Sequence, residues 1–137
     1  MLSVELYAVA AAPPEQVWAL VGDPRRLPEW TDATSVEISA AVAVGTVLTT
    51  RDGKRVLEWR ITTAEQRLLE AVTTLPRGEL GIGVRVVRDP NGSRLILAAG
   101  FTPGDRFADL GWLLLGGPAV RRRFERWTRA ALRTGQA

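Results

Sequence analysis

The stretch PPEQVWALVGDPRRLPEW, residues 13–30, starts and stops two short helices within eighteen residues. Pro14 suits the first turn of a helix, and an apolar stripe at helical spacing follows it: Val17, Leu20 and Val21. Gly22 ends that helix. Asp23 can cap a second short helix that starts at Pro24. The stretch therefore predicts two short helices joined by a sharp break.

Two tryptophans accompany these helices. Trp18 lies on the first helix, and Trp30 follows Pro28, which we expect to end the second one. Such large side chains either close a core or shape a pocket. We expect Trp18 to hold the first helix against its neighbours, whereas Trp30 can serve either purpose.

Alternating apolar and polar residues surround this stretch. Residues 3–10 alternate with a period of two, and six further strand-like segments follow near residues 36–39, 46–50, 55–62, 68–74, 81–88 and 93–102. Asp52-Gly53 and the sequence DPNG at residues 89–92 are strong hairpin signals. The strands are therefore predicted to pair antiparallel as a meander.

Alternation also predicts which side chains share a face of the sheet. The predicted inner face contains three sets: Leu57, Trp59 and Ile61; Ile82, Val84 and Val86; Leu95, Leu97, Ala99 and Phe101. These positions are either plain core or ligand contacts. A register slip of one residue would exchange the faces and bring Glu58, Arg60 or Arg85 inside.

The last thirty residues return to helical spacing. One apolar stripe contains Leu113, Val120, Phe124, Trp127 and Ala131. The opposite face carries arginines: Arg122, Arg126, Arg129 and Arg133. Pro118 either kinks one long helix or begins a new one. We interpret the arginines, including the run 121–123, as a solvated helix face and not as a nucleic-acid site.

Composition limits the chemistry of this chain. Its 137 residues fit a single domain spanning 1–137, and its net charge is only +3. It has no Cys and no His, so a disulfide, a thiolate metal site and a Ser-His-Asp triad are excluded. We expect no metal and no cofactor. Lacking a secretory signal or a spanning segment, the chain is expected to be cytoplasmic, without membrane insertion.

The element order predicts an α+β fold. A single seven-stranded antiparallel sheet with one apolar face needs a cover, and only the final helix is long enough to provide it. We therefore expect a curved sheet wrapped around the C-terminal helix. The two short helices after the first strand would close one end.

This order, together with the motif A-P-P-E-x-V-W-x-L-V-x-D-P-x-x-L-P-E-W at residues 12–30, resembles the START-like (SRPBCC) superfamily of helix-grip proteins, in its polyketide cyclase/dehydrase-like branch. The likeness extends through Val44-Gly45-Thr46 and Ile61-Thr62 to the arginine-rich helix. It implies a hydrophobic cavity between the sheet and the C-terminal helix. The superfamily contains cyclases, lipid carriers and interaction modules, so the fold alone does not decide the function.

The primary hypothesis is binding of a small hydrophobic molecule, such as a polyketide, an aromatic metabolite or a lipid. A cyclase of this kind would act mainly by confining its substrate, and the catalytic residues are unknown. Glu29 and Asp32 are interpreted as solvated loop charges. The expected ligand contacts are Trp30, Leu57, Trp59, Ile61, Val84, Leu97, Phe101, Leu113, Phe124 and Trp127.

The alternative is a non-catalytic protein-interaction module, similar to the cochaperone or ribosome-associated members. Cavity volume separates the two hypotheses. A cavity above about 300 Å³ favours a ligand, whereas a filled interior with an exposed apolar patch favours a protein partner.

Overall fold

The computed structural model describes residues 2–103 and 117–135. Its strands are β1 (Leu2–Ala10), β2 (Ser35–Ile38), β3 (Val47–Asp52), β4 (Arg55–Glu65), β5 (Leu68–Leu75), β6 (Gly78–Asp89) and β7 (Gly92–Pro103). Its helices are α1 (Pro14–Val21), the 3₁₀ helix η1 (Pro24–Glu29) and α3 (Gly117–Gly135). The predicted α+β helix-grip fold, with a seven-stranded antiparallel sheet, is confirmed.

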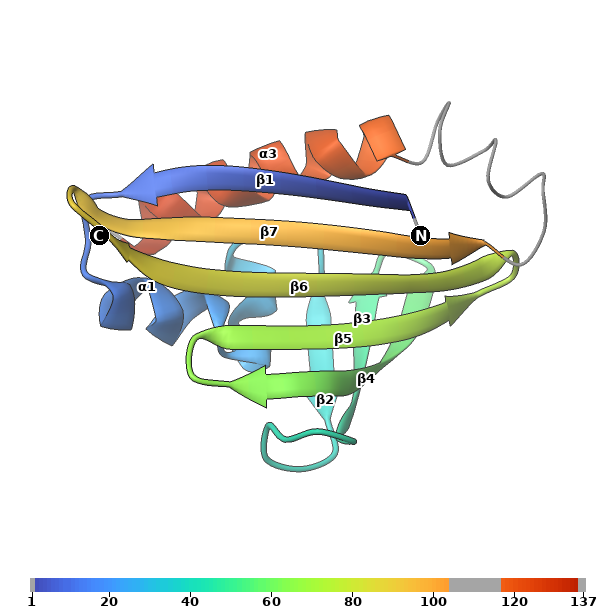
Figure 1. Ribbon diagram of the computed structural model, residues 1–137. Coiled ribbons are helices and arrows are strands. Elements are labelled where there is room, and N and C mark those ends of the chain that lie inside the picture. The colour runs from blue at the N-terminus through green and yellow to red at the C-terminus, as the bar shows by residue number, and fades with distance from the viewer. Residues whose placement is uncertain (1, 104–116, 136–137) are drawn as a thin grey trace.

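The sheet follows the order β1-β7-β6-β5-β4-β3-β2, and every neighbouring pair is antiparallel. The chain therefore runs as a meander from β2 to β7, and β7 then pairs with the first strand. Both predicted hairpins form, after Asp52 and after Asp89. Figure 1 shows the sheet curving around the side on which α1 and α3 lie.

The predicted pair of short helices is present. α1 ends at Gly22, whose N–H donates to the Trp18 carbonyl at 2.8 Å. A side chain at Gly22 would collide with the Trp18 ring, because its Cβ would lie 2.2 Å from that ring. Asp23 caps η1 by accepting from the Arg25 N–H at 3.0 Å. Trp18 therefore packs over the helix end, as expected of a residue that holds α1 in place.

The predicted end of η1 is wrong by one residue. We expected Pro28 to close this helix, but Pro28 lies inside it and the helix continues to Glu29. The φ angle that the proline ring imposes is compatible with a 3₁₀ turn. The Trp30 N–H then donates to the Leu27 carbonyl at 3.2 Å, which completes the last turn and places Trp30 directly after it.

β4 is longer than the pattern indicated. The strand was expected over residues 55–62, but it continues to Glu65 through a register shift between Ile61 and Thr63. Such a bulge inserts one extra residue, so alternation restarts out of phase. Ala64 accordingly packs on the same side as Trp59 and Ile61, although its spacing from Ile61 is odd.

α3 begins at Gly117, so Pro118 lies in the first turn. The predicted helical phase is confirmed: Phe124 is 1% exposed, whereas Arg122, Arg126 and Arg129 are exposed. The helix packs against β1, β7, α1 and η1. Among the described residues no helix combines the length and the apolar character needed to cross a bilayer.

The interior has two unequal halves. In the packed half, α1 and α3 cover the inner faces of β1, β7 and β6, and residues such as Leu95 and Val86 are fully buried. In the cavity half, under β3, β4 and β5, the buried cluster contains only Leu48, Trp59 and Ile61. Other inner side chains of that half, such as Leu57, Leu69 and Ala71, line a hollow.

Candidate ligand-binding cavity

A cavity of about 210 Å³ lies where the two halves meet. The inner faces of strands β3 to β7 form one wall. The opposite wall comes from α3, η1 and the loop after η1, including Trp30 and Phe124. The walls are mostly apolar, and the charged residues that reach the cavity are Asp32, Asp52, Arg55 and Arg123.

Seven of the ten expected contact residues line this cavity: Trp30, Leu57, Trp59, Val84, Leu97, Phe124 and Trp127. Ile61 and Phe101 point inward as expected but do not line it. Ile61 is covered by its neighbours in the Leu48 and Trp59 cluster, and Phe101 packs over the start of β6, near Gly78. Leu113 lies outside the described residues.

Other lining residues were not among the expected contacts, and several lie on β3, β5 and β6: Leu48, Leu69, Ala71, Leu75, Leu80 and Ile82. Ile82 was placed on the inner face by alternation. The β5 residues carry a weak signal, because Leu68 and Leu69 are adjacent and Val72 competes for the inner face. Pairing of Ala71 with Ile61 and Ile82 resolves which face of β5 is inside.

Three tryptophans line the cavity in different ways. The Trp59 indole N–H donates to Thr50 Oγ1 at 3.0 Å, which holds that ring against β3. Trp30 and Trp127 instead pack edge to face, with ring centroids 6.2 Å apart and planes at 86°. Phe124 lies 5.5 Å from the Trp127 ring. Trp30 is therefore both a core residue, 5% exposed, and a cavity wall.

Glu29 is exposed and Asp32 is partly exposed, as expected of solvated charges, and arginines engage both of them. Asp32 Oδ2 lies 3.2 Å from a guanidinium nitrogen of Arg126 and 4.0 Å from Arg123 Nε, so it joins the loop to α3. Glu29 accepts from Arg26 at 2.6 Å and 2.9 Å. This hydrogen bonding lowers the pKa of Glu29 from its ordinary value. Both carboxylates are thus engaged by arginines, which is a poor arrangement for general acid catalysis.

The curved sheet, the gripped helix and the cavity between them define a helix-grip domain of the START-like superfamily. The chain belongs to the family described as polyketide cyclase / dehydrase and lipid transport, whose model matches residues 1–134. No curated protein matches the sequence.

Several solved structures share the fold. The protein XoxI from Bacillus cereus is 17% identical with a TM-score of 0.78, covering 99% of this chain and 96% of its own. A protein from Thermobifida fusca is 20% identical with a TM-score of 0.75, covering 98% and 93%. Ara h 8.0201 is 16% identical with a TM-score of 0.71, covering 98% and 97%. At these identities the likeness concerns the fold alone.

Proposed function

We propose that this protein binds a small, largely apolar molecule in the cavity between strands β3 to β7 and the helices η1 and α3. The observation that carries the proposal is the cavity itself. Aliphatic and aromatic side chains from both walls converge on it, including Leu57, Trp59 and Phe124, while its charged groups are few. Mostly apolar walls with a few polar groups are typical of small-molecule sites.

Cavity size indicates a compact ligand. The volume of about 210 Å³ does not reach the roughly 300 Å³ that would favour a ligand by size alone, where the usual range of drug-sized sites begins, so the proposal depends on the apolar lining and is restricted to small ligands. It exceeds an engineered cavity of about 150 Å³, lined by Leu, Ile and Phe, that binds benzene. A molecule with one or two rings, or a short acyl chain, therefore fits better than an extended polyketide or a whole phospholipid.

Binding is better supported than catalysis. A cyclase that works by confinement needs a pocket that holds a flexible chain near its reactive conformation, and the compact cavity leaves little room for one. Arg126 and Arg123 hold the Asp32 carboxylate, so it is not a free base. We therefore propose a carrier or sensor of a small molecule, with cyclase activity as the narrower possibility.

The interaction-module hypothesis has less support. Among the described residues, the exposed large apolar side chains are Tyr7, Val9, Val42, Val44 and Val56. Two of them lie on β1, two lie in the loop that precedes β3, and Val56 lies on β4. Figure 1 shows β1 and that loop at opposite ends of the molecule. A docking surface for a protein partner would gather such residues on one face.

A cavity-filling substitution tests the proposal. Toluene, indole and naphthalene are titrated while the melting temperature is measured, and tryptophan fluorescence is followed for toluene. Binding raises the melting temperature, because only the folded state has the cavity, and a probe at 100 times its Kd adds about 2.7 kcal/mol. Ala71→Phe places a ring inside the cavity and should abolish the effect.

Thr74→Phe is the matched control. Thr74 lies on the same strand, is exposed and does not line the cavity, so this variant should bind as the original protein does. The proposal fails if none of the three probes raises the melting temperature of the unmodified protein and toluene leaves its tryptophan fluorescence unchanged. It also fails if Ala71→Phe and Thr74→Phe bind the probes equally well.

A further inference from the structure

A second hollow, of about 390 Å³, adjoins the cavity between the end of η1 and the C-terminal half of α3. The two hollows share part of their lining: Trp30, Thr31, Asp32 and Trp127. Beyond this shared wall the surroundings change from apolar to charged. Three arginines of α3 line the second hollow: Arg126, Arg129 and Arg133.

The charges of this arginine hollow do not cancel. Its two carboxylates are already paired, Glu29 with Arg26 at 2.6 Å and Asp32 with Arg126 at 3.2 Å. Arg129 and Arg133, one helical turn apart, form no ion pair within residues 2–103 and 117–135. Within the described part of the chain, the hydrogen bond of Arg129 runs from Nε to the Glu125 carbonyl oxygen at 3.3 Å. Two guanidinium groups are thus left to receive an anion.

The shared wall is closed by ring packing. The Nε1 atoms of Trp30 and Trp127 are both buried, and neither has an acceptor among the described residues. An indole N–H can act only as a hydrogen-bond donor. Burying it without an acceptor is unfavourable. Rotation of either ring away from the other therefore breaks no hydrogen bond. A ligand oxygen at this wall would supply the missing acceptor.

These observations extend the proposed function, on which they rest, to a class of ligand. We propose that the ligand is an amphipathic acid whose apolar body occupies the cavity and whose anionic group reaches the arginine hollow past Trp30 and Trp127. Arg129 and Arg133 bind the anionic group. The acid group thereby orients the ligand. A ligand with an apolar part and an anionic part would occupy both of the adjoining hollows.

A matched pair of probes separates this inference from the proposed function. 4-Phenylbutanoate and 4-phenylbutanamide have the same ring and the same three-carbon arm, and only the first is charged at pH 7. Isothermal titration calorimetry on the full chain gives the Kd of each. We expect both to bind, the acid roughly tenfold more tightly, because hydrogen bonds to charged groups are the stronger ones. That preference should shrink as salt is raised.

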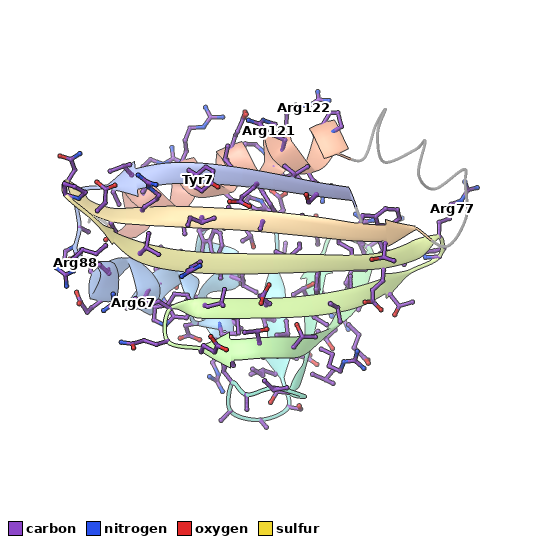
Figure 2. All side chains as sticks on the ribbon, viewed as in Figure 1. Tyr7, Arg67, Arg77, Arg88, Arg121 and Arg122 are labelled. Carbon is purple, nitrogen blue, oxygen red and sulfur yellow. The ribbon has the colours of Figure 1, made fainter. Side chains whose placement is uncertain are left out.

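The arginines are tested with two double variants of equal charge change. Arg129→Gln/Arg133→Gln removes the free guanidinium groups of the hollow and should weaken the acid roughly tenfold, with less than a twofold effect on the amide. Arg121→Gln/Arg122→Gln is the control on the same helix. Figure 2 shows Arg121 and Arg122 near the start of α3, and neither lines either hollow. This control should keep the preference for the acid.

The outcomes are distinguishable. If both probes bind with equal affinity, the cavity stands and the inference is overturned. If the two double variants weaken the acid equally, only the overall charge matters and the arginine hollow is not the site. If neither probe binds, the inference falls together with the proposed function for this kind of ligand. Loss of acid binding in the Arg129/Arg133 variant alone supports it.

Discussion

The packed half and the cavity half use the same pattern of alternating residues and the same antiparallel pairing, but they fill their interiors differently. Under β1, β7 and β6 the helices α1 and α3 cover the sheet, and Leu95 is fully buried. Under β3, β4 and β5 neither α1 nor α3 lies as close, and Leu57 and Ala71 line the cavity. Alternation thus determines the direction of a side chain, whereas the position of α3 determines whether that side chain is covered.

The halves also differ in hydrogen bonding. In the cavity half, Trp59 donates to Thr50 and the Thr73 hydroxyl donates to the Glu58 carbonyl at 2.7 Å. On the helix side, the buried polar atoms without a partner among the described residues are Trp30 Nε1, Trp127 Nε1 and Thr128 Oγ1. The packed half also has a buried side-chain hydrogen bond, from the Ser93 hydroxyl to the Ala12 carbonyl at 2.5 Å, so the difference concerns the polar atoms near α3 and not the whole half.

The largest expected effect is at Trp127, which packs against both Trp30 and Phe124. Trp127→Ala should lower the free energy of unfolding by about 3 to 5 kcal/mol, as for a large aromatic truncation in a core. Arg126→Ala, on the opposite face and paired with Asp32, should cost less than about 1 kcal/mol. Urea denaturation measures both, and equal costs would contradict the assigned helical phase.

Two leucines compare the halves directly. Leu95→Ala, in the packed half, leaves a new void and should cost about 4 kcal/mol. Leu48→Ala only enlarges a hollow that already exists, so we expect about 2 kcal/mol. Chemical denaturation at one pH and temperature gives the difference. Equal costs would mean that the space under β3 to β5 is as tightly filled as the rest.

A pair of threonines tests the hydrogen bonding. Thr50→Val removes the acceptor of the Trp59 N–H and should cost about 1 kcal/mol. Thr128→Val removes a buried hydroxyl that has no partner in the part of the chain that the structure describes, so stability should be unchanged or rise by up to about 1 kcal/mol. Guanidinium titrations of both variants suffice. A larger loss of stability in Thr128→Val than in Thr50→Val would contradict the conclusion that the Thr50 hydroxyl is hydrogen-bonded and the Thr128 hydroxyl is not.

The smallest expected effect on stability concerns the Arg26–Glu29 ion pair of η1. Arg26 lowers the pKa of Glu29 from its ordinary 4.5, so Arg26→Gln should return that pKa toward 4.5, as NMR titration can follow. A carboxylate with a lowered folded-state pKa adds stability above its unfolded pKa and loses it as the pH falls through the folded value. The variant should therefore lose the Glu29 contribution to acid stability. An unshifted Glu29 pKa would contradict the role of this ion pair.

Much of the fold was predictable because its signals are local. Alternation placed Leu95, Leu97 and Ala99 on one face, and Asp52-Gly53 predicted its hairpin. The bulge in β4 was not predictable, since it depends on how Thr63 pairs with Glu70 on the next strand. Local patterns describe a strand, and the register needs its partner.

The candidate site was less predictable for the same reason. Its aromatic residues stand out in the sequence, but Ala71 lines the cavity because of the strands beside it. Asp32 and Arg126 form an ion pair across a wide separation in sequence, and nothing near either residue indicates the other. Their pairing follows from the path of the whole chain around the sheet.

Pairing of the first strand with the last has a consequence for synthesis on the ribosome. Leu2 pairs with Phe101 and Ala10 with Ser93, so β1 cannot find its neighbour until β7 has emerged. At translation rates of 5 to 20 residues per second, the roughly hundred intervening residues take about 5 to 20 seconds. Throughout that interval Val4 and Leu6 lack the backbone pairing with β7 that they have in the folded protein. The native sheet therefore cannot be completed before β7 has emerged, whatever forms earlier around α1 and η1.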